Sequence, residues 1–127
     1  MPSARATWTV LAVALLAFAV FESVQHGWGA TVVMAAFAVM PDLSLIGAFA
    51  EHGKLRPERV AAYNLLHTPW MPLALVAVGL VIAVAGLGLG DLPRLAPFLA
   101  GTAWLTHIAV DRAAGFGLRA RDGSVGN

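Results

Sequence analysis

The chain has 127 residues, of which 59% are hydrophobic and only 12% are charged, and its mean hydropathy is +0.77. This composition argues against a water-soluble domain. The formal net charge of +1, with few basic residues, gives no reason to expect a nucleic-acid partner.

Four apolar segments follow one another along the chain, and each approaches or exceeds the ~20 residues that cross the hydrocarbon core of a bilayer. They cover about residues 7–25, 29–50, 58–89 and 93–111. The connections between them are short, so consecutive segments should run antiparallel. The sequence therefore predicts an all-α fold, a four-transmembrane-helix up-down bundle. We expect a single domain over residues 1–119 and a disordered tail at 120–127.

The first segment also has features of a secretory signal, because Arg5 precedes an apolar run that contains Ala17, Phe18 and Ala19 as a small-residue cleavage pattern. The length of the run favours a membrane span, and removing it would spoil the distribution of basic residues. Seven of the eight Lys and Arg residues fall on one face of a four-span bundle, and the other face receives only Arg94. The seven are Arg5, Lys54, Arg56, Arg59, Arg112, Arg119 and Arg121.

Short loops that are rich in Lys and Arg stay on the cytoplasmic side of a membrane. We therefore expect a multi-pass protein of the bacterial inner (plasma) membrane, with both termini and the loop at 51–59 in the cytoplasm. Basic residues at this face also suit the anionic inner leaflet, so membrane lipid is the expected partner. Oligomerisation is compatible with the sequence.

Ionisable residues interrupt the apolar segments at four positions, Asp42, His67, His107 and Asp111. Such residues are costly in a bilayer and tend to face the interior of a bundle. With ~1.5 Å rise per helical residue, Asp42, His67 and His107 lie about 13, 15 and 8 Å from the cytoplasmic ends of their segments, and Asp111 lies at the rim. We expect the four side chains to meet in the cytoplasmic half of the bundle.

The residue types at these positions are those of a metal site. His107 and Asp111 are four residues apart and share one helix face, which allows them to bind one ion. Two carboxylates and two imidazoles suit Zn²⁺, or a harder ion such as Mn²⁺ or Fe²⁺. Asn64 and Thr68 lie beside His67 on the same segment and are expected to support the site.

Prolines accompany two of the four ionisable residues. Pro41 immediately precedes Asp42, and Pro69 and Pro72 follow His67, so both segments should kink or unwind there. Irregular backbone within a membrane is tolerated only against protein or a wet cavity. The prolines therefore favour a cavity beside the polar side chains, although membrane helices also carry prolines for purely architectural reasons.

Three sequence motifs carry a family resemblance. The segments PDLSLIG at 41–47, YNLLHT at 63–68 and HIAVDRAAGFGLR at 107–119 resemble, in order and spacing, the domain-of-unknown-function 4260 family. The resemblance covers about residues 7–119 and implies a small four-helix bacterial membrane protein with no established activity. Pro41-Asp42, His67-Thr68 and His107-Asp111 are more distantly similar to inner-membrane metal-dependent hydrolase-like families, whose arginine before the central histidine has no counterpart here.

The preferred functional hypothesis is a metal-dependent hydrolase that acts on a lipid-like ester or phosphoester. Two alternatives remain open. One is a non-catalytic bundle with a structural Asp/His hydrogen-bond network, and the other is a proton- or ion-translocating protein. Glu22 and His26 lie toward the opposite face and are placed outside the site. The sequence does not decide whether the chain is an enzyme, or which metal and substrate it takes.

Overall fold

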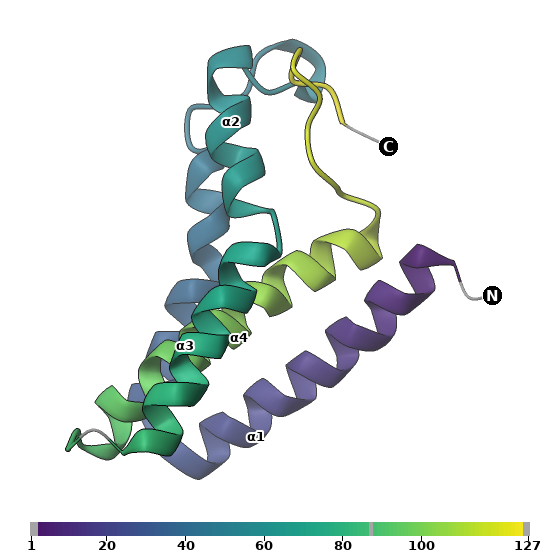
Figure 1. Ribbon diagram of the computed structural model, residues 1–127. Helices are drawn as coiled ribbons and strands as arrows, with labels where there is room; N and C mark the ends of the chain where they lie inside the picture. Colours follow the sequence, from purple (N-terminus) through teal and green to yellow (C-terminus); the bar gives the residue numbers. More distant parts are fainter. Residues whose placement is uncertain (1–2, 87, 126–127) are drawn as a thin grey trace.

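The computed structural model describes residues 3–86 and 88–125, and these residues form helices joined by short turns (Figure 1). The order is α1 (Ala4–Val39), the 3₁₀ turns η1 (Met40–Leu45) and η2 (Glu51–Gly53), α2 (Pro57–Leu66), α3 (Trp70–Ala85) and α4 (Asp91–Ala114). Within the described residues, extended pairing is limited to two isolated bridges. The predicted all-α class is confirmed.

Helix α1 consists of two arms that meet at Gly27. The φ and ψ angles of Gly27 are 78° and −158°, a conformation that only glycine adopts without strain. Figure 1 shows the two arms running in opposite directions from this bend. The bend falls inside the connection at 26–28 that the sequence predicts, so the 36 residues of α1 form two helical arms rather than one continuous helix.

The long apolar segment predicted at 58–89 is divided into two helices. Helix α2 ends at Leu66, and α3 begins at Trp70 after Pro69, which has no backbone N–H to continue the helix. In the same way, α1 gives way to the tighter turn η1 at Pro41. The prediction that the helices are interrupted beside the polar residues is confirmed.

The second apolar segment also ends earlier than expected. The sequence places a span over 29–50, but helix α1 stops at Val39 and the chain turns through η1 into a loop. Asp42 therefore lies just beyond the end of a helix and is 48% exposed at its side chain. The depth of ~13 Å expected for Asp42 assumed a continuous helix, which Pro41 prevents.

Helix α4 packs against both arms of α1 and against α3. A buried cluster joins α1 to α4 through Ala30, Met34, Leu99 and Ala103. Glycines allow α3 and α4 to approach closely: a Cβ at Gly101 would lie 2.8 Å from the backbone nitrogen of Val76, and one at Gly79 would overlap the backbone of Phe98. Both glycines therefore serve the close packing of α3 against α4.

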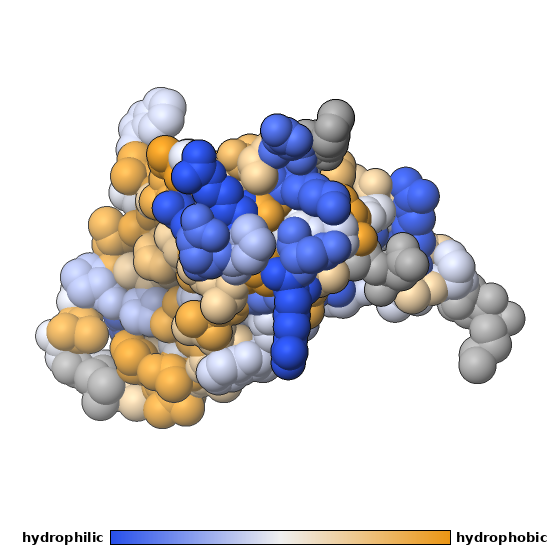
Figure 2. Space-filling model, turned by 90° about the horizontal axis from the view of Figure 1, so that it is seen from above, coloured by the Kyte–Doolittle hydropathy of each residue, from blue (hydrophilic) through white to orange (hydrophobic). Residues whose placement is uncertain are grey.

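The outer surface of the helices is apolar. Two helical stretches, Ala4–Leu45 and Pro57–Ala85, are long and apolar enough to cross a membrane. Only 6% and 11% of their most apolar windows are buried, so their side chains point outward rather than into a protein core. Seen from above, hydrophilic residues gather over the end that holds α2 and the chain around it, with apolar residues around them (Figure 2).

The segment after α4 folds back toward α2 (Figure 1). The side-chain amide of Asn64 bonds to both backbone groups of Arg119, at 2.7 and 2.9 Å, and the N–H of Leu55 donates to the carbonyl of Gly123. The Ser124 hydroxyl and amide donate to Asp122 and hold the pKa of that carboxyl below its ordinary value. The sequence predicts a disordered tail at 120–127, whereas residues 120–125 form this turn; residues 126–127 lie outside the described residues.

Candidate metal centre

Three separate elements bring the four ionisable residues together. Asp42 lies in η1, His67 caps the end of α2, and His107 and Asp111 lie one turn apart near the end of α4. One ligand atom from each residue lies within 4.8 Å of every other. The four therefore lie close enough to bind a metal ion, and we refer to them as the Asp/His cluster.

The imidazoles and carboxylates alternate around the centre of the cluster. His107 Nε2 lies 3.2 Å from Asp42 Oδ1 and 3.3 Å from Asp111 Oδ2. His67 Nε2 lies 3.4 and 3.5 Å from the same two oxygens. One oxygen of each carboxylate thus lies within 3.5 Å of the Nε2 atoms of both histidines.

The far nitrogen of each imidazole is fixed by a backbone carbonyl. His67 Nδ1 lies 2.8 Å from the carbonyl oxygen of Tyr63, and His107 Nδ1 lies 2.6 Å from that of Ala38. A carbonyl oxygen can only accept, so each Nδ1 carries the hydrogen and donates it. In a neutral imidazole this leaves Nε2 with a free lone pair, which is the state that binds metals.

Both Nε2 atoms are buried and make no hydrogen bond within the described residues. The His67 and His107 side chains are only 3% and 10% exposed. A buried polar atom without a partner costs about 1–3 kcal/mol, so two of them aimed at one point require an explanation. A cation among the four atoms would supply a partner, and so would a proton on either Nε2 that pairs with the carboxylates.

The spacing of the atoms agrees with shared coordination. Ligand bonds of ~2.1 Å at angles between 90° and 109° place neighbouring ligand atoms about 3.0–3.4 Å apart. The four distances in the cluster are 3.2–3.5 Å. Direct charge-assisted N–H···O bonds are shorter, about 2.7–2.9 Å. The groups are within ion-pair distance, but the spacing is wider than in a closed Asp/His hydrogen-bond network.

Neighbouring side chains hold the end of α2, and with it His67, in place. The ring of Tyr63 stacks on the His67 imidazole with centroids 3.9 Å apart and an interplanar angle of 18°. The Trp104 indole donates to the carbonyl of Leu66 at 2.8 Å, and Arg112 donates to the carbonyl of His67 at 3.3 Å. These bonds satisfy carbonyls that the end of a helix leaves unpaired.

Asn64 and Thr68, which the sequence predicts as supporting residues, bond elsewhere. Asn64 binds the backbone of Arg119, as described above. The hydroxyl of Thr68 donates to the Asn64 carbonyl at 2.6 Å. Both side chains stabilise the backbone around the site, and their hydrogen bonds do not reach the Asp/His cluster.

A pocket of about 230 Å³ opens beside the cluster, and sequence reasoning did not foresee its walls. Asp42 and Asp111 form one side. The other lining residues are Leu45, Phe49, Tyr63, Phe116 and Arg119. The available signal was that Phe116 and Arg119 belong to the same motif as His107 and Asp111, but only folding of the C-terminal segment over α2 brings them to the site.

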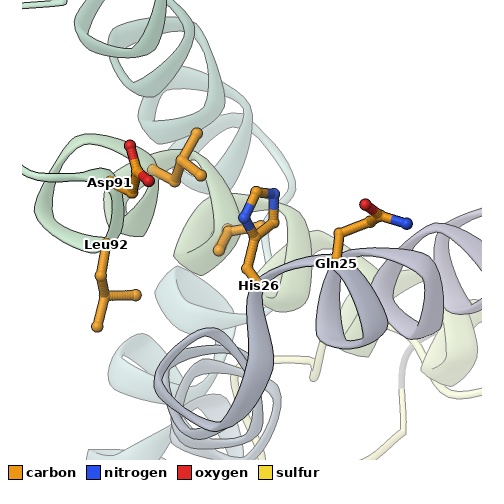
Figure 3. Close-up of a pocket in the computed structure, with 6 residues that line it drawn as sticks. Gln25, His26, Asp91 and Leu92 are labelled. Atoms are coloured by element: carbon orange, nitrogen blue, oxygen red, sulfur yellow. The ribbon is translucent and has the colours of Figure 1, made fainter.

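The opposite end of the bundle holds a second polar group. His26 Nε2 lies 3.3 Å from Glu22 Oε2, one turn earlier on the first arm of α1. Gln25, His26, Asp91 and Leu92 line a pocket of about 210 Å³, and Figure 3 shows His26 between Asp91 at the start of α4 and Gln25, whose side chain points away from α4. As the sequence predicts, Glu22 and His26 do not join the Asp/His cluster.

A family model described as "domain of unknown function (DUF4260)" matches residues 7–125. No curated protein and no solved structure matches the chain. The distant similarity to hydrolase-like families therefore stays a prediction, whereas the family resemblance is confirmed over nearly the whole sequence. The chain belongs to the DUF4260 family.

Proposed function

We propose that this protein is a metal-dependent hydrolase of the bacterial inner membrane that acts on a lipid-like ester or phosphoester. One observation carries the proposal: two buried Nε2 atoms that make no hydrogen bond within the described residues converge on two carboxylates, and each imidazole is oriented by a carbonyl behind it. This backing of a metal-binding histidine by a hydrogen-bond acceptor is general in metal sites.

The donor set of two nitrogens and two oxygens suits Zn²⁺, with Mn²⁺ and Fe²⁺ as harder candidates. When bound, such an ion polarises a carbonyl or phosphoryl oxygen and makes water a better nucleophile at neutral pH. The chain contributes the positions of the four ligands. Tyr63 and Arg112 hold His67, and the carbonyl of Ala38 sets the ring of His107.

The cluster is open on one side, which supports a catalytic rather than a purely structural site. The histidine side chains are buried, whereas the side chains of Asp42 and Asp111 are 48% and 26% exposed and line the pocket. Four protein ligands are the number found in a closed structural zinc site, so catalysis here requires the ion to take water or substrate as a fifth ligand from the side of the pocket.

The membrane placement is also a proposal. The two arms of α1, the α2–α3 pair and α4 would cross the bilayer in turn, with the outward-facing apolar side chains against lipid. The basic residues near the Asp/His cluster would then face the cytoplasm. In this orientation the pocket opens near the inner-leaflet surface, where lipid ester and phosphoester groups lie.

The metal content of detergent-purified protein, measured by elemental mass spectrometry, tests the proposal. We expect near-stoichiometric Zn, Mn or Fe in the wild type and its loss in the Asp42→Ala and His67→Ala variants. His26→Ala serves as the matched control and should keep its metal, because His26 forms its ion pair with Glu22 and is not part of the Asp/His cluster. Folding of each variant is checked by circular dichroism and gel filtration.

Activity is then measured on metal-loaded protein with a water-soluble nitrophenyl ester and a nitrophenyl phosphodiester. Hydrolysis that disappears with a chelator and in Asp42→Ala supports the proposal. A wild type that neither holds nor takes up Zn²⁺ or Mn²⁺ would overturn it in favour of the structural Asp/His network or a proton pathway.

A further inference from the structure

We propose that Arg119 binds the anionic group of the substrate, and that the pocket takes a phosphoester carrying an apolar substituent rather than a neutral carboxylic ester. This inference rests on the proposed function, because it assigns the substrate class of the same site. Three independent features of the pocket carry it: its charge, the way Arg119 is held, and its aromatic wall.

With a divalent cation bound at the Asp/His cluster, the charges of the site would leave the pocket electropositive. The carboxylates of Asp42 and Asp111 would neutralise the cation, and imidazoles that bind a metal through Nε2 carry no charge. The guanidinium of Arg119 on the pocket wall then has no compensating charge, because among the described residues no carboxylate lies within ion-pair distance of it. A confined pocket lined by uncompensated positive charge favours an anionic ligand.

Arg119 is held in a fixed position before any ligand binds. Both of its backbone groups are bonded to the amide of Asn64. One guanidinium nitrogen, Nη1, donates to the carbonyls of Gly53 and Gly123 at 3.0 and 3.2 Å, and the guanidinium lies over the ring of Tyr63. A guanidinium has five N–H donors in a planar fork, and this fork suits phosphate oxygens. Preorganisation lowers the entropic cost of binding.

Aromatic rings provide the apolar side of the pocket. Phe49 and Phe116 line it and are 46% and 53% exposed, so each presents a large part of its ring to the open space. Phe116 comes from the same C-terminal segment as Arg119. The pocket thus offers a cation and an apolar wall next to the carboxylates of the proposed metal centre.

The substrate class follows from the ionisation of the two kinds of ester. A phosphomonoester or phosphodiester keeps a negative charge at neutral pH, whereas a carboxylic ester is neutral at its reacting group. A phosphoester can therefore pair its charge with both the arginine and the metal as soon as it binds, whereas a carboxylic ester offers them only a neutral carbonyl oxygen. Its apolar part would contact Phe49 and Phe116, which describes a lipid phosphate and also a small aryl phosphate.

Calorimetric titration of metal-loaded protein in a neutral detergent tests this inference through binding. The first probe is phenyl phosphate. Because phenyl phosphate is itself a phosphoester, released phosphate is assayed after each titration and the heat of any hydrolysis is subtracted. We expect Arg119→Gln to weaken the binding of phenyl phosphate about 10- to 100-fold, as expected for loss of charged hydrogen bonds. Arg119→Lys keeps the charge but loses the planar fork, so its affinity for phenyl phosphate should lie between those of Arg119→Gln and the wild type. Arg121→Gln is the matched control, because Arg121 is an exposed arginine outside the pocket lining.

The second probe, inorganic phosphate, distinguishes the contribution of Arg119 to binding from that of the aromatic rings. Phe116→Ala should weaken the binding of phenyl phosphate several-fold and leave the binding of inorganic phosphate unchanged, because only the phenyl ring contacts the aromatic wall. Dihexanoyl phosphatidic acid is the third probe. If it binds more tightly than phenyl phosphate, the ligand is a membrane lipid, and the reverse order indicates a water-soluble phosphoester.

The outcomes distinguish this inference from the proposed function. Metal binding is measured in every variant, and Arg119→Gln should retain it because Arg119 is not part of the Asp/His cluster. Normal metal content together with phenyl phosphate affinity unchanged in Arg119→Gln would overturn the inference and leave the metal centre intact. Loss of metal from the wild type itself would overturn the proposed function.

Discussion

The two ends of the bundle carry similar pairs of residues with different surroundings. At one end, His107 and Asp111 are spaced four apart on α4; at the other, Glu22 and His26 have the same spacing on α1. Both pairs are separated by 3.3 Å. Only the first pair is joined by groups from other elements, Asp42 from η1 and His67 from the end of α2.

This comparison shows that spacing within one helix does not make a site. His107 has its Nδ1 fixed by a carbonyl from α1 and its Nε2 buried, whereas the His26 side chain is 36% exposed. Asp91 lines the pocket next to His26. Its side chain is 91% exposed, and its Oδ1 lies 3.5 Å from Arg94 Nη2. The Glu22–His26 pair joins a buried carboxyl to a half-exposed imidazole of the same helix. What distinguishes the Asp/His cluster is the convergence of several elements on buried nitrogen atoms.

The largest expected difference between the two ends is in stabilisation by metal. A ligand that binds only the folded state at 100 times its dissociation constant adds about 2.7 kcal/mol to the free energy of unfolding. We expect Zn²⁺ or Mn²⁺ to raise the melting temperature of the wild type and EDTA to reverse the effect. Scanning fluorimetry in detergent should show this shift in His26→Ala but not in His107→Ala. Equal shifts in both variants would mean that the metal binds elsewhere.

The second prediction concerns the packing that positions α4. Gly101→Ala places a methyl group against Pro72 and Val76 in the first turns of α3, close to His67, and should cost about 1–3 kcal/mol of stability. Gly79→Ala should cost a similar amount, but further from the cluster. Gly90→Ala is the control, because its Cβ would meet only Pro93 at 3.9 Å.

Metal affinity should separate the two packing variants. We expect Gly101→Ala to lower the affinity for metal about tenfold, because disturbing the groups that orient a metal ligand has an effect of this size. Gly79→Ala should lower the affinity less. The measurement is calorimetric titration with Zn²⁺. The same affinity in Gly101→Ala as in the wild type would show that the position of α4 against α3 does not control the site.

Much of the cluster could be predicted from the sequence because charged residues in apolar segments have few acceptable places. Asp42, His67, His107 and Asp111 stand out on this ground alone, and the order of the segments brings them to one end. Gly27 could be anticipated as a bend because it lies in a short polar interruption between apolar runs.

The rest of the site could not be predicted, for physical reasons. The carbonyls of Ala38 and Tyr63 orient the histidines, but every residue has a carbonyl, so the sequence gives no sign of which one is used. Asn64 was expected near the site because it shares a helix face with His67. Its amide instead satisfies the extended backbone at Arg119, a partner more than fifty residues away.

The third prediction tests whether the aromatic ring behind the cluster matters. Stacked aromatic pairs contribute about 0.5–1.5 kcal/mol, so Tyr63→Leu should weaken metal binding about 2- to 10-fold by loosening His67. Tyr63→Phe keeps the stacked ring and should bind metal like the wild type, losing only the hydroxyl bond to Gly117. Trp28→Leu is the control at the other end, where the ring is 84% exposed. Zn²⁺ titration of the three variants is the measurement.

The smallest effect is expected at the Glu22–His26 pair. Helical pairs with this spacing contribute about 0.3–0.5 kcal/mol when exposed, and because Glu22 is buried the cost of Glu22→Gln should be somewhat larger, about 1 kcal/mol. Urea unfolding of Glu22→Gln, His26→Ala and the double variant measures the coupling directly. Metal content should equal that of the wild type in all three.

The same variants decide between a site at one end and a path through the bundle. A proton or ion pathway needs polar groups at both ends, so Glu22→Gln would then reduce proton flux into liposomes as strongly as Asp111→Asn does. The structure gives no reason for such coupling, because Glu22 and His26 bond to each other and the buried cluster of Ala30, Met34, Leu99 and Ala103 is wholly apolar. We therefore expect Asp111→Asn to abolish metal binding, while Glu22→Gln leaves both metal content and proton flux unchanged.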